Sequence, residues 1–176
     1  MARPGESPRT VKAWPLTPLI ALKLIAFHAQ PQRHRRGAGL LRAAGVRTPE
    51  LLAGPRLLRR NGTWLVEIEL AHASGELALD AVRGASTSDQ RAAIRRAIDR
   101  LLDQFHAAGL LNRDLKLSNL LFAPAAGGQD NSLEVVVLDP VGVRRTGDGH
   151  AARIRHEERL RVEDPAAWDR LQSSAD

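Results

Sequence analysis

The sequence predicts an α+β fold, in which a small antiparallel sheet with one helix precedes a mainly helical half. The chain has 176 residues, of which 43% are hydrophobic and 26% charged, and this composition is typical of a globular domain. Asn61-Gly62 stands between two apolar runs, which is the strongest short signal for a β-hairpin. A stripe of apolar residues at helical spacing dominates the second half: Ile94, Ile98, Leu101, Leu102 and Phe105.

The first half begins with residues 1–10, which we expect to be irregular, and with a short strand over residues 10–14 that ends at Pro15. Residues 16–27 are apolar at positions that suit a helix and a strand equally, so both remain open. Residues 32–44 form a predicted basic helix, which ends at Gly45. Residues 51–53, 57–58 and 64–70 are predicted to be extended around the Asn61-Gly62 turn.

The second half begins with a helix that has capping residues at 86–89 and ends at Gly109. An apolar pair at 110–111, a polar loop over 112–119 and a strand over 120–122 follow. A turn rich in Gly, Asn and Asp at 127–132 precedes residues 133–138, whose valine-rich run predicts a buried strand. The arginine-rich tail over 144–161 is poorly patterned, and a last helix begins at Asp164-Pro165.

Composition and charge exclude several classes of protein. The chain has no cysteine, which excludes disulfide scaffolds, thiolate zinc sites and cysteine nucleophiles. The net charge is +6, but only 3% of the residues are aromatic, so few side chains could stack on bases and nucleic acid is a disfavoured partner. The apolar residues 14–27 contain two prolines and Lys23, and are too short to span a membrane. We therefore expect a cytoplasmic protein, with peripheral contact to the inner face of the membrane left open.

The polar loop carries the residue types that phosphoryl transfer requires. Asp114 and Asn119 are joined by Lys116, and Asp139 ends the next buried strand. This reaction needs a carboxylate to accept the proton of the attacking hydroxyl, a cation beside the phosphate and oxygen ligands for magnesium. The loop therefore predicts a phosphotransferase site.

Three stretches resemble one known family. Residues 112–119, Asn-Arg-Asp-Leu-Lys-Leu-Ser-Asn, resemble the catalytic loop H-R-D-L-K-x-x-N of the protein-kinase-like fold, with Asn112 in place of histidine. Residues 137–145 resemble the I-D-x-D-G-V-R ending of the bacterial lipopolysaccharide core kinases, the heptose/Kdo branch of that fold, with Val141 in place of the second Asp. Residues 39–53, with the run Ala-Gly-Val-Arg-Thr-Pro, resemble the segment that follows the C-helix in that branch.

The resemblance implies a kinase that uses ATP and Mg²⁺ to phosphorylate a lipopolysaccharide core sugar or another hydroxyl acceptor. Asp114 would be the catalytic base, and Lys116 would neutralise the γ-phosphate. Asn119 and Asp139 would hold magnesium and the nucleotide phosphates.

Two lysines compete for the α/β-phosphates. The family places a helical segment after its strand lysine, which favours Lys12, whereas Ile20-Ala21-Leu22-Lys23 resembles the V-A-I-K motif directly, which favours Lys23. Lys12 is the modest preference. By position alone, the backbone of residues 67–71 would bind adenine.

The resemblance also implies a two-lobed domain over residues 1–176. A reduced N-lobe over 10–70 would hold a small antiparallel sheet and the C-helix. A shortened, mainly helical C-lobe over 71–176 would hold the catalytic loop at 112–119 and a metal-binding segment at 138–143.

Two departures from the family keep a second function open. Alignment of Arg35-Arg36-Gly37 with the family's R-R-E places Gly37 where a C-helix glutamate would pair with the strand lysine. No glycine-rich loop precedes Lys12. A pseudokinase that acts as a binding or regulatory module is therefore the alternative to an enzyme, and a kinase directed at a protein or an aminoglycoside is the nearest enzymatic alternative.

Overall fold

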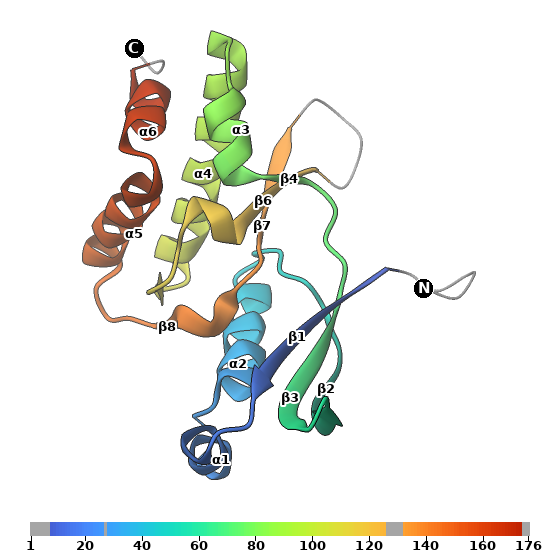
Figure 1. Cartoon of the computed structure of the whole chain (residues 1–176). Helices are drawn as coiled ribbons and strands as arrows, with labels where there is room; N and C mark the ends of the chain where they lie inside the picture. Colours follow the sequence, from blue (N-terminus) through green and yellow to red (C-terminus); the bar gives the residue numbers. More distant parts are fainter. Residues whose placement is uncertain (1–7, 27, 126–131, 174–176) are drawn as a thin grey trace.

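The fold is α+β, as predicted, in a computed structural model that describes residues 8–26, 28–125 and 132–173. Figure 1 shows the sheet and helices of residues 9–71 at one end of the molecule, and the helices of residues 78–172 around smaller sheets at the other end. In chain order the elements are β1 Arg9–Pro15, α1 Pro18–Ile25, α2 Gln30–Ala43, β2 Leu51–Arg60, β3 Thr63–Ala71, β4 Glu76–Leu77, α3 Ala78–Gly84, α4 Ser88–Ala107, β5 Leu110–Asn112, the 3₁₀ helix η1 Leu117–Asn119, β6 Leu120–Pro124, β7 Leu133–Val137, the 3₁₀ helix η2 Pro140–Gly142, β8 Val143–Arg145, α5 Gly149–Glu163 and α6 Pro165–Gln172.

The N-terminal sheet has the antiparallel order β1-β3-β2. The predicted hairpin turn is confirmed, because Asn61 and Gly62 have φ values of 47° and 79°, as a type I′ turn requires. The carboxylate of Glu67 in β3 is fully buried and accepts hydrogen bonds at 2.7 Å from both Arg56 and Arg60 of β2. These charge-assisted bonds satisfy a charge that burial alone would make unfavourable.

Two helices follow β1. The ambiguous segment is helical over Pro18–Ile25, with Thr17 as its N-cap, and no residue of α1 is buried. The predicted basic helix is confirmed as α2, and Gly45 follows it with a φ of 72°. Gly37 lies at the contact between α2 and η2, where an added Cβ would come within 1.9 Å of the Pro140 carbonyl oxygen. Only glycine allows this close approach.

The C-terminal part is organised around α4, the predicted amphipathic helix. A capping box begins it, in which Thr87 and Gln90 satisfy each other's backbone N–H groups. Its apolar stripe is the centre of the main core, and α3, α5 and α6 pack around it. The buried members of the stripe are Ile94, Ile98, Leu101, Leu102 and Phe105.

Two small antiparallel sheets lie beside α4. One has the order β4-β6-β7 and contains the predicted strands at 120–122 and 133–138, and the other pairs β5 with β8. The Arg47 carbonyl oxygen accepts a bond of 2.9 Å from the Val137 N–H, which ties the chain after α2 to β7. All residues of the predicted turn at 127–132 except Ser132 lie outside the described residues. Residues 1–7 also lie outside them.

In the tail, the structure contains elements that the sequence analysis did not predict. Residues 144–161 form the end of β8 and most of α5, a helix with Asp148 as its N-cap and with Ala152, His156 and Leu160 buried. Arginines and glutamates surround these three residues and hide the helical spacing. The last helix is confirmed, with Asp164 capping α6.

Among the described residues, no helix has the length and hydropathy that a membrane-spanning segment needs.

Candidate active site

Five of the six predicted site residues lie in one linked network. Lys12 of β1 places its Nζ 3.6 Å from the Asp139 carboxylate and donates to the Leu138 carbonyl oxygen at 3.2 Å. The Leu138 N–H donates to the Asn119 carbonyl oxygen at 2.8 Å. The network therefore joins the N-terminal sheet to the ends of β7 and η1.

The second half of the network is the loop that contains Asp114. The Asn119 side-chain amide donates to the Asp114 carbonyl oxygen at 3.0 Å, and Lys116 Nζ lies 3.0 Å from the Asp114 carboxylate. Both members of this ion pair are more than 40% exposed, so the pair adds little to stability and is free to rearrange around a ligand.

Asn112, which stands where the family motif has histidine, stabilises the loop through a hydrogen bond inside it. Its side-chain oxygen accepts the Asp114 N–H at 3.1 Å, so Asn112 fixes the backbone of the predicted base. Gly142 lies against the same groups, since an added Cβ there would be 2.6 Å from Asn112 Oδ1 and 2.9 Å from Asp114 N. Gly142 thus permits the predicted metal-binding segment to contact the predicted catalytic loop.

The loop is also held from outside by α5, which sequence reasoning missed. His156 Nε2 accepts the Asn112 N–H at 2.8 Å, and the Glu163 carboxylate accepts the Ser118 N–H at 2.8 Å and the Ser118 hydroxyl at 2.5 Å. Burial lowers the pKa of His156 to about 4, so it is neutral at pH 7 and able to accept that bond. No sequence motif marks these residues, because α5 itself has no clear pattern.

Another buried histidine lies beneath the network. His34 of α2 is fully buried, and within the described part of the chain neither ring nitrogen has a hydrogen-bond partner. Burial, and then the charge of Lys12, lower the pKa of His34 to about 4. The ring is therefore neutral and adds no positive charge beside Lys12.

A cavity of about 470 Å³ opens over this network, and we call it the charged cavity. Lys12, Arg33, Arg113, Asp114 and Asp139 supply its charged lining. Its volume is in the range of small-molecule sites. Groups of opposite charge in one cavity suit a ligand that combines phosphates with a divalent cation.

The residues present fit a magnesium ion. Asp139 offers a carboxylate and Asn119 an amide oxygen, the hard oxygen ligands that Mg²⁺ takes from proteins, and phosphates and water ordinarily complete its shell. The donor role of the Asn119 amide nitrogen leaves its oxygen available. Within the described ranges no cluster of three or more acidic or histidine side chains offers an alternative metal site.

The other sequence predictions have mixed outcomes. Lys23 lies on the exposed α1 and does not line the charged cavity. The backbone of residues 67–71 is not available to adenine, because β3 is the central strand and pairs with β1 on one side and β2 on the other. The segment that leads from β3 to β4 is instead residues 72–75.

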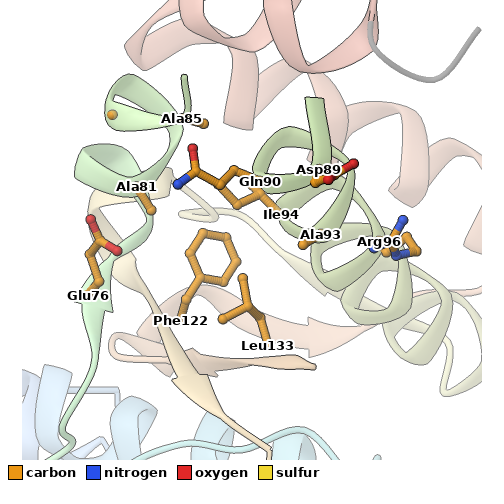
Figure 2. A pocket seen from close by; sticks show the side chains of 11 residues that line it. Glu76, Ala81, Ala85, Asp89, Gln90, Ala93, Ile94, Arg96, Phe122 and Leu133 are labelled. Atoms are coloured by element: carbon orange, nitrogen blue, oxygen red, sulfur yellow. The ribbon is translucent and has the colours of Figure 1, made fainter. Parts of the chain in front are cut away.

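Another cavity, of about 530 Å³, lies elsewhere, between α3, α4 and β6. Figure 2 shows Phe122 and Leu133 directed toward Gln90 and Ile94 of α4, with Glu76 and Arg96 on opposite sides. None of the network residues lines it. We place the site at the charged cavity because Asp114 and Asp139 line it together with Lys12, and these three belong to the network of predicted site residues.

Comparison with known proteins supports the fold. No protein-family model matches the sequence, and no curated protein matches it. Among 169 solved chains that match is WaaP in complex with acyl carrier protein, with a TM-score of 0.55 and 16% sequence identity over 79% of this chain. The match spans 64% of the WaaP chain. The chain therefore has a fold similar to that of WaaP.

Proposed function

We propose that this protein is an ATP- and Mg²⁺-dependent phosphotransferase that phosphorylates a sugar hydroxyl, as the lipopolysaccharide core kinases do. The observation that carries the proposal is the network of Lys12, Asp139, Asn119, Asp114 and Lys116, of which Lys12, Asp114 and Asp139 line the charged cavity. The fold likeness adds support, since WaaP is a lipopolysaccharide core heptose kinase. The two-lobed division, with the cavity between residues 10–70 and 71–176, belongs to this proposal.

Each side chain has a defined role in the proposed reaction. Asp114 accepts the proton of the acceptor hydroxyl, whose oxygen bonds to the γ-phosphorus while the bond to the bridging oxygen of ADP breaks. Lys116 lies beside Asp114, where it offsets the charge of the transferred phosphoryl group. The products are ADP, a phosphate monoester and a proton. Bound magnesium would neutralise phosphate charge, and Asp139 and Asn119 would hold it.

The position of Lys12 supports its assignment to the α/β-phosphates. Its Nζ is next to Asp139, so a nucleotide whose magnesium is held by Asp139 brings its phosphates within reach of Lys12. Lys23 does not line the charged cavity, so it has no comparable position beside Asp139.

Nucleotide binding provides the first test. ATP with Mg²⁺ at 100 times its Kd adds about 2.7 kcal/mol to the free energy of unfolding. For a chain of this size that raises the Tm by about 5–10 °C. Asp139→Ala should abolish the shift, whereas Asp80→Ala, which removes an exposed carboxylate from α3, should retain it. If the unmodified protein shows no shift at millimolar ATP, the kinase proposal fails.

Turnover separates an enzyme from a nucleotide-binding module. Asp114→Asn should lower phosphoryl transfer by about 10²–10⁴-fold while the thermal shift with ATP is kept. One observation favours the module as a second candidate: Gly37 packs on Pro140, so α2 carries no glutamate at the position that would pair with Lys12. ATP binding without transfer to any hydroxyl acceptor would select the module.

We also propose that the protein works in the cytoplasm at the inner face of the membrane. Leu19, Leu22 and Ile25 of α1 are 59%, 63% and 78% exposed, and Lys23 lies on the same helix. An exposed apolar face next to a cation suits an anionic lipid surface. The protein should co-sediment with anionic vesicles, whereas the double variant Leu22→Ser/Ile25→Ser should remain in the supernatant. Equal co-sedimentation of the parent protein and the double variant would refute a membrane contact through α1.

A further inference from the structure

A second concave surface adjoins the charged cavity, and five arginines line it. We call it the arginine groove. Its volume is about 400 Å³, and its lining contains no carboxylate. The guanidinium groups come from three parts of the chain, α2, the catalytic loop and β8: Arg33, Arg36, Arg113, Arg144 and Arg145.

These arginines lack the partners that arginines elsewhere in the molecule have. Across residues 8–26, 28–125 and 132–173, none of the five makes an ion pair or a side-chain hydrogen bond. By contrast, Arg56 and Arg60 bind Glu67, and Arg153 binds Asp103. Five unpaired positive charges in one groove repel each other, and a bound anion would relieve that repulsion.

The fold brings these charges together. Arg33 and Arg36 are three residues apart in α2, so they share one face of that helix. The Gly37 contact presses α2 against η2, and β8 follows η2 directly. The Arg113 N–H donates to the Gly142 carbonyl oxygen at 3.2 Å, which brings the catalytic loop to the same edge.

The groove is continuous with the proposed reaction site. Arg33 and Arg113, together with Val141 and Gly142, line both the arginine groove and the charged cavity. Arg113 immediately precedes Asp114. A molecule seated in the groove therefore has a path to the carboxylate that we assign as the base.

We propose that the arginine groove is the acceptor subsite and that the acceptor is an anionic sugar, with phosphate or carboxylate groups beside the hydroxyl that is phosphorylated. This inference rests on the proposed function, because it places the acceptor relative to Asp114. The planar guanidinium group binds phosphate and carboxylate through two parallel charge-assisted hydrogen bonds, and a neutral sugar offers no negative charge to offset the five arginines. The small groove volume and the scarcity of aromatic residues favour a sugar over nucleic acid.

The test measures binding without nucleotide, so that it does not depend on phosphoryl transfer. The probe is fructose 1,6-bisphosphate, with fructose as the neutral control, titrated into the full chain by calorimetry at low ionic strength. The test variant is Arg36→Ala/Arg144→Ala, because both residues line the groove and neither lines the charged cavity. The matched control is Arg35→Ala/Arg159→Ala, which removes two exposed arginines that do not line the groove.

We expect the bisphosphate to bind and fructose not to bind. The test variant should bind about 100-fold more weakly, or about tenfold for each arginine, which corresponds to about 1.4 kcal/mol for each. The control variant should change the Kd by less than about threefold, as expected for long-range charge screened by salt. Unchanged Tm values for both variants would show that the folds are intact.

Three outcomes would overturn the inference. Equal weakening in both double variants would mean that net charge, and not the groove, attracts the probe. No binding of the bisphosphate by a chain that binds ATP with Mg²⁺ would reject the groove and leave the kinase proposal standing. Vesicles of anionic phospholipid that bind through Arg36 and Arg144, without binding of the sugar phosphate, would assign the groove to lipid headgroups. Groove-dependent sugar binding in a chain that does not bind ATP would reject the kinase proposal, and with it the acceptor role, and would leave the groove as a binding site for anionic sugars.

Discussion

Replacement of Gly37 by alanine is expected to destabilise the protein, although the same change at Gly39, two residues along α2, is expected to stabilise it. An added Cβ at Gly37 would lie 1.9 Å from the Pro140 carbonyl oxygen and 2.8 Å from the Pro140 carbonyl carbon. Both contacts are far below van der Waals separation, and both involve backbone atoms that cannot rotate away. At Gly39 no atom lies within 4 Å of the added Cβ.

The magnitudes follow from these two environments. Overpacking of this kind costs about 1–3 kcal/mol, and the contact at Gly37 places it toward the upper end. Alanine in a helix gains about 1 kcal/mol over glycine, which offsets part of the cost at Gly37 and is the whole effect at Gly39. We therefore expect Gly37→Ala to lower the free energy of unfolding by about 1–2 kcal/mol and Gly39→Ala to raise it by about 0.5–1 kcal/mol.

Urea unfolding of the two variants beside the parent chain measures both changes. Because Gly37 contacts the segment that follows Asp139, Gly37→Ala should also reduce the thermal shift with Mg²⁺ and ATP, whereas Gly39→Ala should keep it. If Gly37→Ala is as stable as Gly39→Ala, the close contact between α2 and η2 is wrong. Gly37→Glu should not restore a kinase-like ion pair, for the same steric reason.

Three further predictions concern buried and half-buried polar groups. The pKa values of His34 and His156 are both lowered to about 4 in the folded protein, from an ordinary value of 6.5. Because the unfolded chain then binds more protons, the free energy of unfolding should fall by roughly 3 kcal/mol for each histidine between pH 6.5 and pH 4. Urea unfolding that shows constant stability from pH 6.5 to pH 5 would contradict this. Glu67→Gln should cost about 1–3 kcal/mol in urea, because it weakens the charge-assisted bonds to a buried group, and a neutral result would argue against that ion pair. Glu163→Ala should cost a similar amount and raise hydrogen exchange at residues 112–119, and unchanged exchange there would refute the anchoring role of α5.

Local signals predicted much of the fold. The Asn61-Gly62 turn, the stripe of α4, the cap within residues 86–89 and the cap at Asp164 are short-range features, and each appears where the sequence predicted it. Helix α5 was missed because only Ala152, His156 and Leu160 of its fifteen residues are buried, too few to give a periodic apolar pattern.

The candidate site, like the fold, could be predicted only in part from the sequence. The spacing of Asp114, Lys116 and Asn119 within one loop predicted a chemical unit, and hydrogen bonds and an ion pair join these residues in the fold. The role that we propose for Lys12 depends on its approach to Asp139, which is distant in sequence, so local motifs could not distinguish Lys12 from Lys23.

By itself, the sequence determined the elements that depend on neighbouring residues and which chemical groups the 112–119 loop carries, because turns, caps and short motifs are local. Only the tertiary structure decided that Gly37 is a packing residue, that α5 supports the loop at His156 and Glu163, and that separate arginines share one groove. These features arise from contacts between distant segments. Their positions are set by how the helices and sheets pack, which no local pattern encodes.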